Sequence, residues 1–243
     1  MASPTKVTLS ARLKSSPGLH PKNTWPKWLH IILNSNLLTG LFYSVQATCS
    51  IFVVNIITMK KLIVSEWMSL DGVVDASSME QWFNPYHSDS RGKYIQDIIH
   101  DCDAMLYGRI TYEMLHGYWS MMQNNEMGVA EKLNKVKKYV ASAHLEEAKW
   151  ENTTIIKQNI IQEIAALKKA TSGNILVQGS TMLVKTLLQA GLVDELKLLI
   201  NPHIMGTSGG RLFEDMNSSF ELVNVQSLEK GVLAVSYKPV QAA

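Results

Sequence analysis

The sequence has only two cysteines, Cys49 and Cys102, and they form no CxxC pair or other metal-binding spacing. Its seven histidines also lack the HxH and HExxH patterns from which many metal sites are built. We therefore expect no metal site and no disulfide framework. The cysteines are predicted to be reduced thiols in a reducing compartment.

Acidic residues are missing from the first 58 residues, which carry five Lys or Arg side chains, and the first acid of the chain is Glu66. The remaining part, 59–243, carries 18 basic and 21 acidic residues, a net charge of −3. Because this part has no basic excess, we do not expect it to bind nucleic acid. Its length of roughly 185 residues suits one domain with a full hydrophobic core.

A long hydrophobic run is missing as well. Residues 31–58 carry no charge, but polar side chains interrupt them before they reach the ~18 consecutive apolar residues of a membrane span: Asn34, Ser35, Asn36, Gln46 and Asn55. We treat 1–58 as an extension outside the domain 59–243. It has three open interpretations: sequence upstream of a true start at Met59, an organelle transit peptide, or a weak membrane anchor. The protein is expected in the cytoplasm, or in an organelle if the extension is a transit peptide.

The usual phosphate-binding fingerprints, GxGxxG and the Walker loop, are absent. Instead, a short apolar strand over 103–107 runs through Gly108, Arg109 and Thr111 into a predicted helix. Free N–H groups at a helix start attract anions, and glycine permits a ligand to approach the backbone closely. Arginine can donate two hydrogen bonds to phosphate oxygens. This junction predicts a phosphate site, although an ordinary helix start with a surface arginine would have the same pattern.

A second junction of the same kind follows the apolar strand at 174–178, where Gly179, Ser180 and Thr181 lead into another predicted helix. Ligands of open α/β sheets lie outside the carboxyl ends of the strands. If the two strand ends are neighbours, they could hold both halves of a dinucleotide.

From residue 60 onward, predicted strands alternate with predicted helices, and beyond 191 the pattern consists mainly of strands. Strands are expected over 61–68, 103–107, 139–142, 153–157, 174–178, 194–200, 220–227 and 232–238. Helices are expected over 90–101, 109–117, 127–138, 159–169 and 182–188. The alternation predicts an α/β fold, with a mixed, mostly parallel sheet, helices on both faces and antiparallel C-terminal strands.

Four ordered motifs resemble those of the dihydrofolate-reductase-like superfamily: MSLDG at 68–72, YGRITYE at 107–113, VQGS at 177–180 and GLVDEL at 191–196. The resemblance spans 60–238. It is strongest to the reductase domain of the bifunctional riboflavin-pathway deaminase/reductase and its stand-alone relatives. It implies the three-layer αβα sandwich of that superfamily, and the zinc-binding deaminase motifs are absent.

The resemblance also implies NADPH as the cofactor, lying across the carboxyl ends of the strands. Arg109 and Thr111 would then hold cofactor phosphates, with Ser142 as a further candidate for the 2′-phosphate. The pyrophosphate would lie at the second junction, on Gly179, Ser180 and Thr181, with Gly108 at the first.

The loop that borders the nicotinamide in this superfamily corresponds to Asp71 and Gly72. Asp71 is the first candidate for a catalytic group acting on the substrate, or else it only shapes the turn. True dihydrofolate reductases have a carboxylate on the first helix. The corresponding stretch here, 79–85, offers Glu80 as a second catalytic candidate, and the weak match disfavours folate reduction. Trp82 is either an aromatic wall for a flat substrate or a core residue.

The sequence therefore predicts an NADPH-dependent reductase of a small heterocyclic or carbonyl substrate. The reference case is 5-amino-6-(5-phosphoribosylamino)uracil, a riboflavin precursor. The alternatives are a dihydrofolate reductase and a nucleotide-binding module without catalysis. A homodimer is expected, both from family precedent and because the apolar C-terminal strands would leave an exposed edge.

Overall fold

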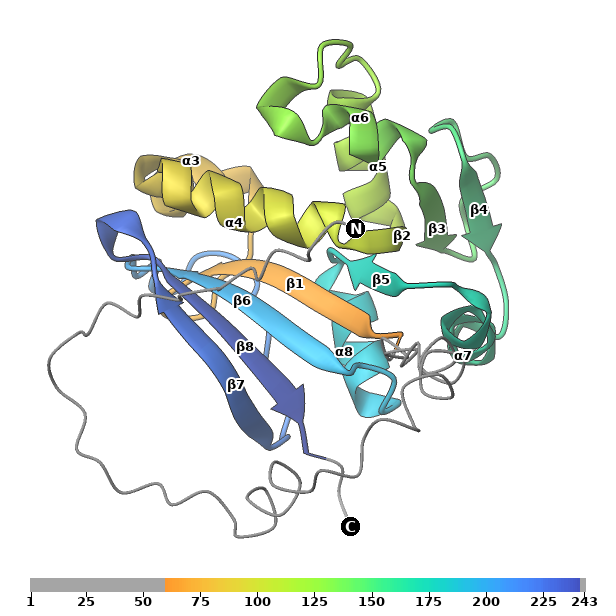
Figure 1. Ribbon diagram of the computed structural model, residues 1–243. Helices are drawn as coiled ribbons and strands as arrows, with labels where there is room; N and C mark the ends of the chain where they lie inside the picture. The colour runs from red at the N-terminus through yellow and green to blue at the C-terminus, as the bar shows by residue number, and fades with distance from the viewer. Residues whose placement is uncertain (1–59, 241–243) are drawn as a thin grey trace, which may run out of the picture. The chain divides into compact units, whose positions relative to one another are not determined.

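A computed structural model describes residues 60–240, which form one eight-stranded sheet with helices on both faces (Figure 1). The strand order is β4-β3-β2-β5-β1-β6-β8-β7. The first six strands of this order run parallel to one another, and β8 and β7 are antiparallel to their neighbours. The strands are β1 Leu62–Ser69, β2 Cys102–Gly108, β3 Lys137–Ala141, β4 Thr153–Ile156, β5 Asn174–Val177, β6 Glu195–Asn201, β7 Phe220–Ser227 and β8 Leu233–Pro239.

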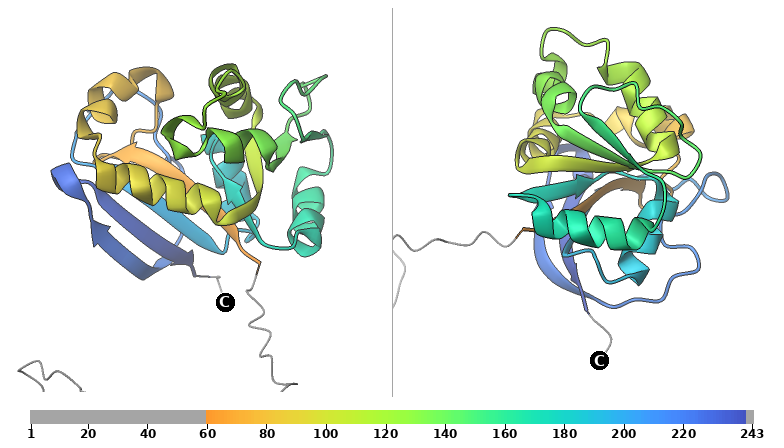
Figure 2. Two further views of the ribbon diagram at one scale, coloured as in Figure 1. Left: turned by 45° about the horizontal axis from the view of Figure 1, so that its top comes forward. Right: turned by 90° about the vertical axis from the view of Figure 1, so that its right-hand side faces the viewer.

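The helices form the two outer layers of an αβα sandwich, as the views in Figure 2 show from the side. One face is covered by α4 (Asp89–His100), α5 (Arg109–Trp119) and α6 (Ala130–Lys135), and the other by α7 (Ile160–Ala170) and α8 (Thr181–Gln189). Short helical segments complete the described chain: η1 Ala76–Ser78, α3 Met79–Trp82, η2 Asn84–Tyr86, η3 Glu126–Gly128 and η4 Glu229–Gly231. The predicted fold class is thereby confirmed.

The central strands are buried on both faces, which explains their continuous apolar sequences. In β1, Leu62 and Val64 pack with the helices α7 and α8, whereas Ile63 between them packs with the opposite layer. This alternation follows from the two-residue period of a strand, which directs successive side chains of β1 to opposite faces of the sheet.

One predicted helix is wrong in extent. The helix expected over 127–138 is only α6, because Val136 adopts an extended backbone conformation and β3 begins at Lys137. Pairing of β3 with β2 and β4 overrides the local helical pattern of this lysine-rich stretch. The other expected helices and strands agree with the structure to within a few residues at their ends.

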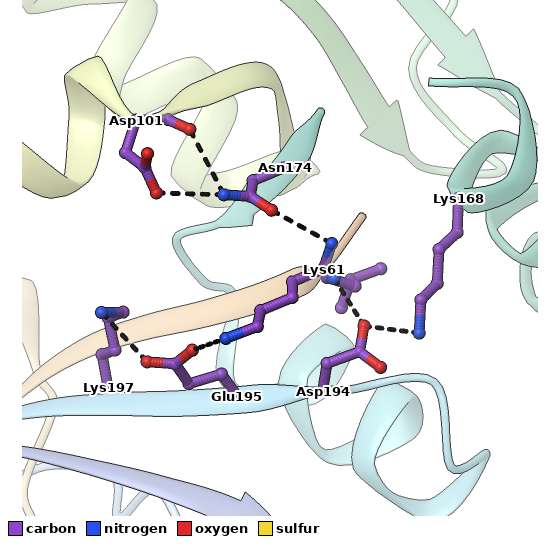
Figure 3. A network of polar contacts seen from close by, with 8 residues as sticks. Lys61, Asp101, Lys168, Asn174, Asp194, Glu195 and Lys197 are labelled. Atoms are coloured by element: carbon purple, nitrogen blue, oxygen red, sulfur yellow. Dashed lines mark hydrogen bonds and ion pairs between the residues drawn. The ribbon is translucent and has the colours of Figure 1, made fainter. Parts of the chain in front are cut away.

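A polar network holds together the amino ends of the parallel strands (Figure 3). The Lys61 ammonium group lies 2.9 Å from Glu195, and the Lys61 backbone N–H donates to Asn174 at 3.1 Å. Asp194 accepts from the backbone N–H of Leu62 at 2.7 Å and pairs with Lys168. These contacts fix the register of β1 between β5 and β6. They lie at the amino ends of the strands, so the carboxyl ends remain for ligands.

Within residues 60–240, no helix is both long enough and apolar enough to cross a membrane. The extension predicted at 1–58 lies outside the described residues.

Candidate functional site

The two glycine junctions meet at the carboxyl ends of the parallel strands, because β5 is inserted between β1 and β2 and thus pairs with β2. The Gly108 backbone N–H donates to the Gly179 carbonyl oxygen at 3.1 Å. A side chain at Gly108 would collide with the Ser180 hydroxyl and approach the Ser180 backbone nitrogen to 3.0 Å. The sequence-based inference that the two strand ends could be neighbours is therefore confirmed, and glycine is what permits their close approach.

Both helices at this edge begin without a side-chain cap. Gly108 is the N-cap of α5 and Ser180 is the N-cap of α8, and neither provides a capping hydrogen bond from its side chain. Gly179 has a positive φ of 62°, and a Cβ on it would lie 2.8 Å from the Thr111 hydroxyl oxygen. The starts of two helices and the Thr111 hydroxyl thus lie together around Gly108 and Gly179, and free N–H groups at helix starts attract anions.

Arg109 and Ser142 lie at the ends of neighbouring strands, β2 and β3. The Arg109 guanidinium is exposed and lies 2.7 Å from Glu113, one turn further along α5. Ser142 is buried, and its hydroxyl oxygen accepts from the backbone N–H groups of His144 and Leu145 at 3.1 and 3.0 Å. Its O–H can still donate to an anion, because only the oxygen lone pairs are used.

Asp71 joins two loops. Its carboxylate accepts from the Ser69 hydroxyl at 2.6 Å, from the backbone N–H groups of Met205 and Gly206 at 3.1 and 2.9 Å, and from Arg211 at 3.3 Å. The hydrogen bonds from Ser69, the largest contributor, and from the Met205 and Gly206 N–H groups lower the pKa of Asp71 to about 2. The carboxylate is thus ionised at neutral pH and fixed in place, which favours its interpretation as a residue that shapes the turn.

Gly72 belongs to the same loop and has a φ of 84°, which glycine adopts without steric cost. Its carbonyl oxygen accepts from the Leu212 N–H at 3.1 Å, so the loop is also held by its backbone.

Glu80 and Trp82 lie on the short helix α3. Glu80 is exposed, whereas Trp82 is 1% exposed and donates its indole N–H to the Asp75 carbonyl oxygen at 3.1 Å. Its ring packs edge-on against Phe83. These contacts fit a core residue better than a wall of the substrate site.

Glu66 was not predicted as a site residue, although it is the first acid of the chain and stands in the buried strand β1. One of its carboxyl oxygens accepts from the Gly179 backbone N–H at 2.6 Å. Burial raises the pKa of Glu66 to about 7, against the opposing effect of that hydrogen bond. A single carboxyl residue among apolar neighbours in a strand was the available sequence signal.

An apolar cavity of about 460 Å³ lies on the same face of the sheet as Glu66. Its floor is formed by alternate residues of β6, namely Leu196, Leu198 and Ile200, and Phe213 and Tyr237 also line it. The volume is within the range of small-molecule sites in proteins.

Comparisons with known proteins support the fold. The model of a protein family described as the RibD C-terminal domain matches residues 60–234. The uncharacterized protein YyaP of Bacillus subtilis (strain 168) is 28% identical over 190 residues, covering 75% of this chain and 97% of that protein.

Two solved structures share the fold. A pyrimidine reductase-like protein from Corynebacterium diphtheriae superimposes with a TM-score of 0.57 at 15% identity, covering 76% of this chain and 94% of its own. A dihydrofolate reductase from Enterococcus faecalis, complexed with NADP(H), superimposes with a TM-score of 0.52 at 15% identity, covering 75% of this chain and 98% of its own.

Proposed function

Because the chain belongs to the RibD C-terminal domain family, whose membership implies oxidoreductase activity, we propose that it is an NADPH-dependent reductase of a small heterocyclic or carbonyl substrate. The observation that carries this proposal is the contact between Gly108 and Gly179, which brings two uncapped helix starts together. A dinucleotide with its phosphate groups has the charge and the length to use both.

In this proposal the phosphates of NADPH lie along the carboxyl edge of the sheet. Arg109 and Thr111 hold cofactor phosphates, with Ser142 as a further candidate for the 2′-phosphate, and Gly179, Ser180 and Thr181 at the start of α8 take the pyrophosphate. The residues present fit such a group, since a Cβ at Gly108 would meet Ser180 and one at Gly179 would meet Thr111. The two glycines thus let two helix starts lie close together, and free N–H groups at helix starts bind anions. When bound, the nicotinamide supplies the hydride, and the protein supplies placement and electrostatics.

The reference substrate of the proposal is 5-amino-6-(5-phosphoribosylamino)uracil. Dihydrofolate reduction is the less favoured alternative, because Glu80 is exposed and has no contact with the site among the described hydrogen bonds. A nucleotide-binding module without catalysis would have the same phosphate contacts, so cofactor turnover distinguishes it from an enzyme. Asp71 is proposed to order the loop beside the nicotinamide through its contacts with Met205, Gly206 and Arg211.

The test is a comparison of NADPH and NADH binding. Charge-assisted hydrogen bonds to phosphate contribute about 1.5–3 kcal/mol each, so we expect NADPH to bind at least about tenfold more tightly than NADH. Arg109→Gln should weaken NADPH binding by a similar factor and leave NADH binding almost unchanged. Titration calorimetry with both cofactors measures these four dissociation constants.

Lys93→Gln is the matched control, because Lys93 forms the same kind of exposed ion pair, 2.6 Å from Asp97 on α4. It should leave the affinity for both cofactors unchanged. Equal dissociation constants of the wild-type protein for NADPH and NADH would refute the 2′-phosphate assignment.

A further inference from the structure

We propose that Glu66 is the catalytic acid of this reductase and that the apolar cavity on the same face of the sheet selects an uncharged carbonyl substrate. The inference depends on the proposed function, because a proton donor is needed only if a hydride is transferred. It names a catalytic residue. It also names a substrate class, which differs from the phosphorylated riboflavin precursor taken above as the reference substrate.

The first observation is the position of Glu66 in the sheet. It lies on β1 between Val64 and Met68, and both of these side chains belong to the core cluster on the α7 and α8 face of the sheet. The two-residue period of the strand directs Glu66 to the same face. Its carboxyl group reaches the Gly179 N–H at 2.6 Å, at the junction where the cofactor is proposed to bind.

The second observation is the place of the cavity. In the parallel register Glu66 is paired with Leu198, and Met68 is paired with Ile200. Leu198, Met68 and Ile200 line the cavity. Glu66 therefore stands between the Gly179 junction on one side and the cavity floor on the other. A substrate in the cavity lies on the sheet face to which Glu66 points.

The surroundings of the carboxyl group suit an acid. Gly179 is its one hydrogen-bond partner among the described residues, and part of the Glu66 surface is accessible. Burial raises its pKa to about 7, and no charged side chain of the described residues contributes to this shift. The pKa of Asp71, in contrast, is lowered to about 2, so Asp71 holds no proton to donate at neutral pH.

The lining of the cavity selects the substrate. Leu196, Leu198, Ile200 and Phe213 offer hydrocarbon surface, and none of the lining residues is charged. Burying an unpaired anion there would be costly, so a substrate without a charge at the buried end is favoured.

The reaction balances with NADPH as the reductant. Hydride adds to the carbonyl carbon, the C=O π electrons move to oxygen, and the Glu66 carboxyl O–H bond breaks to give the alcohol. The products are the alcohol, NADP⁺ and the Glu66 carboxylate, which regains its proton from water before the next turnover. General acid catalysis of this kind contributes about 10²–10⁴-fold in rate.

The experiment compares the wild type with Glu66→Gln, Glu66→Asp and the control Glu195→Gln. Glu195 is also a buried carboxylate in the sheet, but it pairs with Lys61 and Lys197 away from the site. The probes are benzaldehyde and para-carboxybenzaldehyde, which differ by one charge. Three quantities are measured: NADPH affinity, steady-state rates across pH, and the infrared band of protonated carboxyl groups in the ligand-free protein.

We expect Glu66→Gln to lower kcat for benzaldehyde by about 100-fold or more, with NADPH affinity within about threefold of the wild type. The wild-type kcat should fall as pH rises through about 7, and this dependence should vanish in Glu66→Gln. Glu66→Asp should restore part of the rate, and Glu195→Gln should keep the wild-type profile. A carboxyl band that titrates near pH 7 should be missing from Glu66→Gln, whereas Glu66→Asp and Glu195→Gln should keep one.

Several outcomes would overturn the inference while leaving the proposed function intact. One is a wild-type rate in Glu66→Gln, another is a loss of NADPH affinity as large as the loss of kcat, and a third is the absence of a band titrating near neutrality. Equal kcat/KM for the two aldehydes, or reduction of neither by the NADPH-bound wild type, would overturn the substrate class. Failure of the wild type to bind NADPH would instead refute the proposed function.

Discussion

At the scale of single residues, Glu66 makes the stability of the protein depend on pH. Its pKa is raised from 4.5 to about 7 by burial, so the folded state holds this proton more tightly than the unfolded chain. The resulting stabilisation is complete below pH 4.5 and is lost as pH rises through about 7. The shift corresponds to a change on the order of 3 kcal/mol in the free energy of unfolding.

Glu66→Gln should therefore have a flatter stability profile between pH 5 and pH 8 than the wild type, because the amide does not titrate in the window set by the Glu66 pKa. Urea unfolding at several pH values measures this difference. Glu195→Gln serves again as the control, since Glu195 is a buried carboxylate of the same sheet, but contacts with Lys61 and Lys197 lower its pKa despite the opposing effect of burial. Parallel profiles of wild type and Glu66→Gln would show that the carboxyl has an ordinary pKa.

At the scale of elements, the contact between the starts of α5 and α8 depends on Gly108. Gly108→Ala places a methyl group against Ser180, whose backbone nitrogen would be 3.0 Å away. The two junctions must separate, which we expect to cost about 1–3 kcal/mol of stability and to abolish measurable NADPH binding. Thermal unfolding and cofactor titration of the same sample measure the two effects.

Gly117→Ala is the matched control, because Gly117 lies in the same helix and an added Cβ there meets no atom within 4 Å. Alanine is the better helix former by about 0.5–1 kcal/mol, so this variant should be as stable as the wild type or more so. If Gly108→Ala kept full cofactor affinity, the close approach of the two helix starts would not be needed for binding.

The apolar pattern expected at an exposed edge, Val232, Leu233 and Val235, is not at one, because β8 lies between β6 and β7 and Val232 and Val235 are buried. At the scale of the whole molecule, the edge strand β7 is instead the expected site of self-association. Leu222, Val223 and Val225 are 55%, 58% and 55% exposed on this strand, which has a neighbour on one side only. An exposed apolar edge favours pairing with a second copy. We predict a dimer at micromolar concentration by sedimentation, and a monomer for Val225→Glu.

The control is Met121→Glu, because Met121 is 69% exposed and lies beyond the end of α5, far along the chain from β7. This variant should sediment as the wild type does. A monomeric wild type, or a dimer that persists in Val225→Glu, would place self-association elsewhere or exclude it.

Local patterns in the sequence were enough to predict the fold class and the two glycine junctions. The spacing of apolar residues that distinguishes strands from helices can be read from short segments. Glycine at a strand end indicates close backbone approach before any partner is known. The same local rules were wrong for 127–138, where pairing of β3 with its neighbours decided the conformation of Lys137 and Lys138.

Only the tertiary structure decided what the carboxylates do. Asp71 carries a carboxyl group as Glu66 does, but hydrogen bonds from Ser69, the largest contributor, and from Met205 and Gly206, more than 130 residues away, lower its pKa. Glu66 meets the Gly179 N–H because β5 is inserted beside β1, an order that no segment of the sequence specifies by itself. The sequence by itself determined most of the helices and strands, because these depend mainly on neighbours along the chain, whereas strand pairing decided the conformation of Lys137 and Lys138. The pKa of a carboxyl group depends on burial and on neighbours in space, so it was decided by the fold.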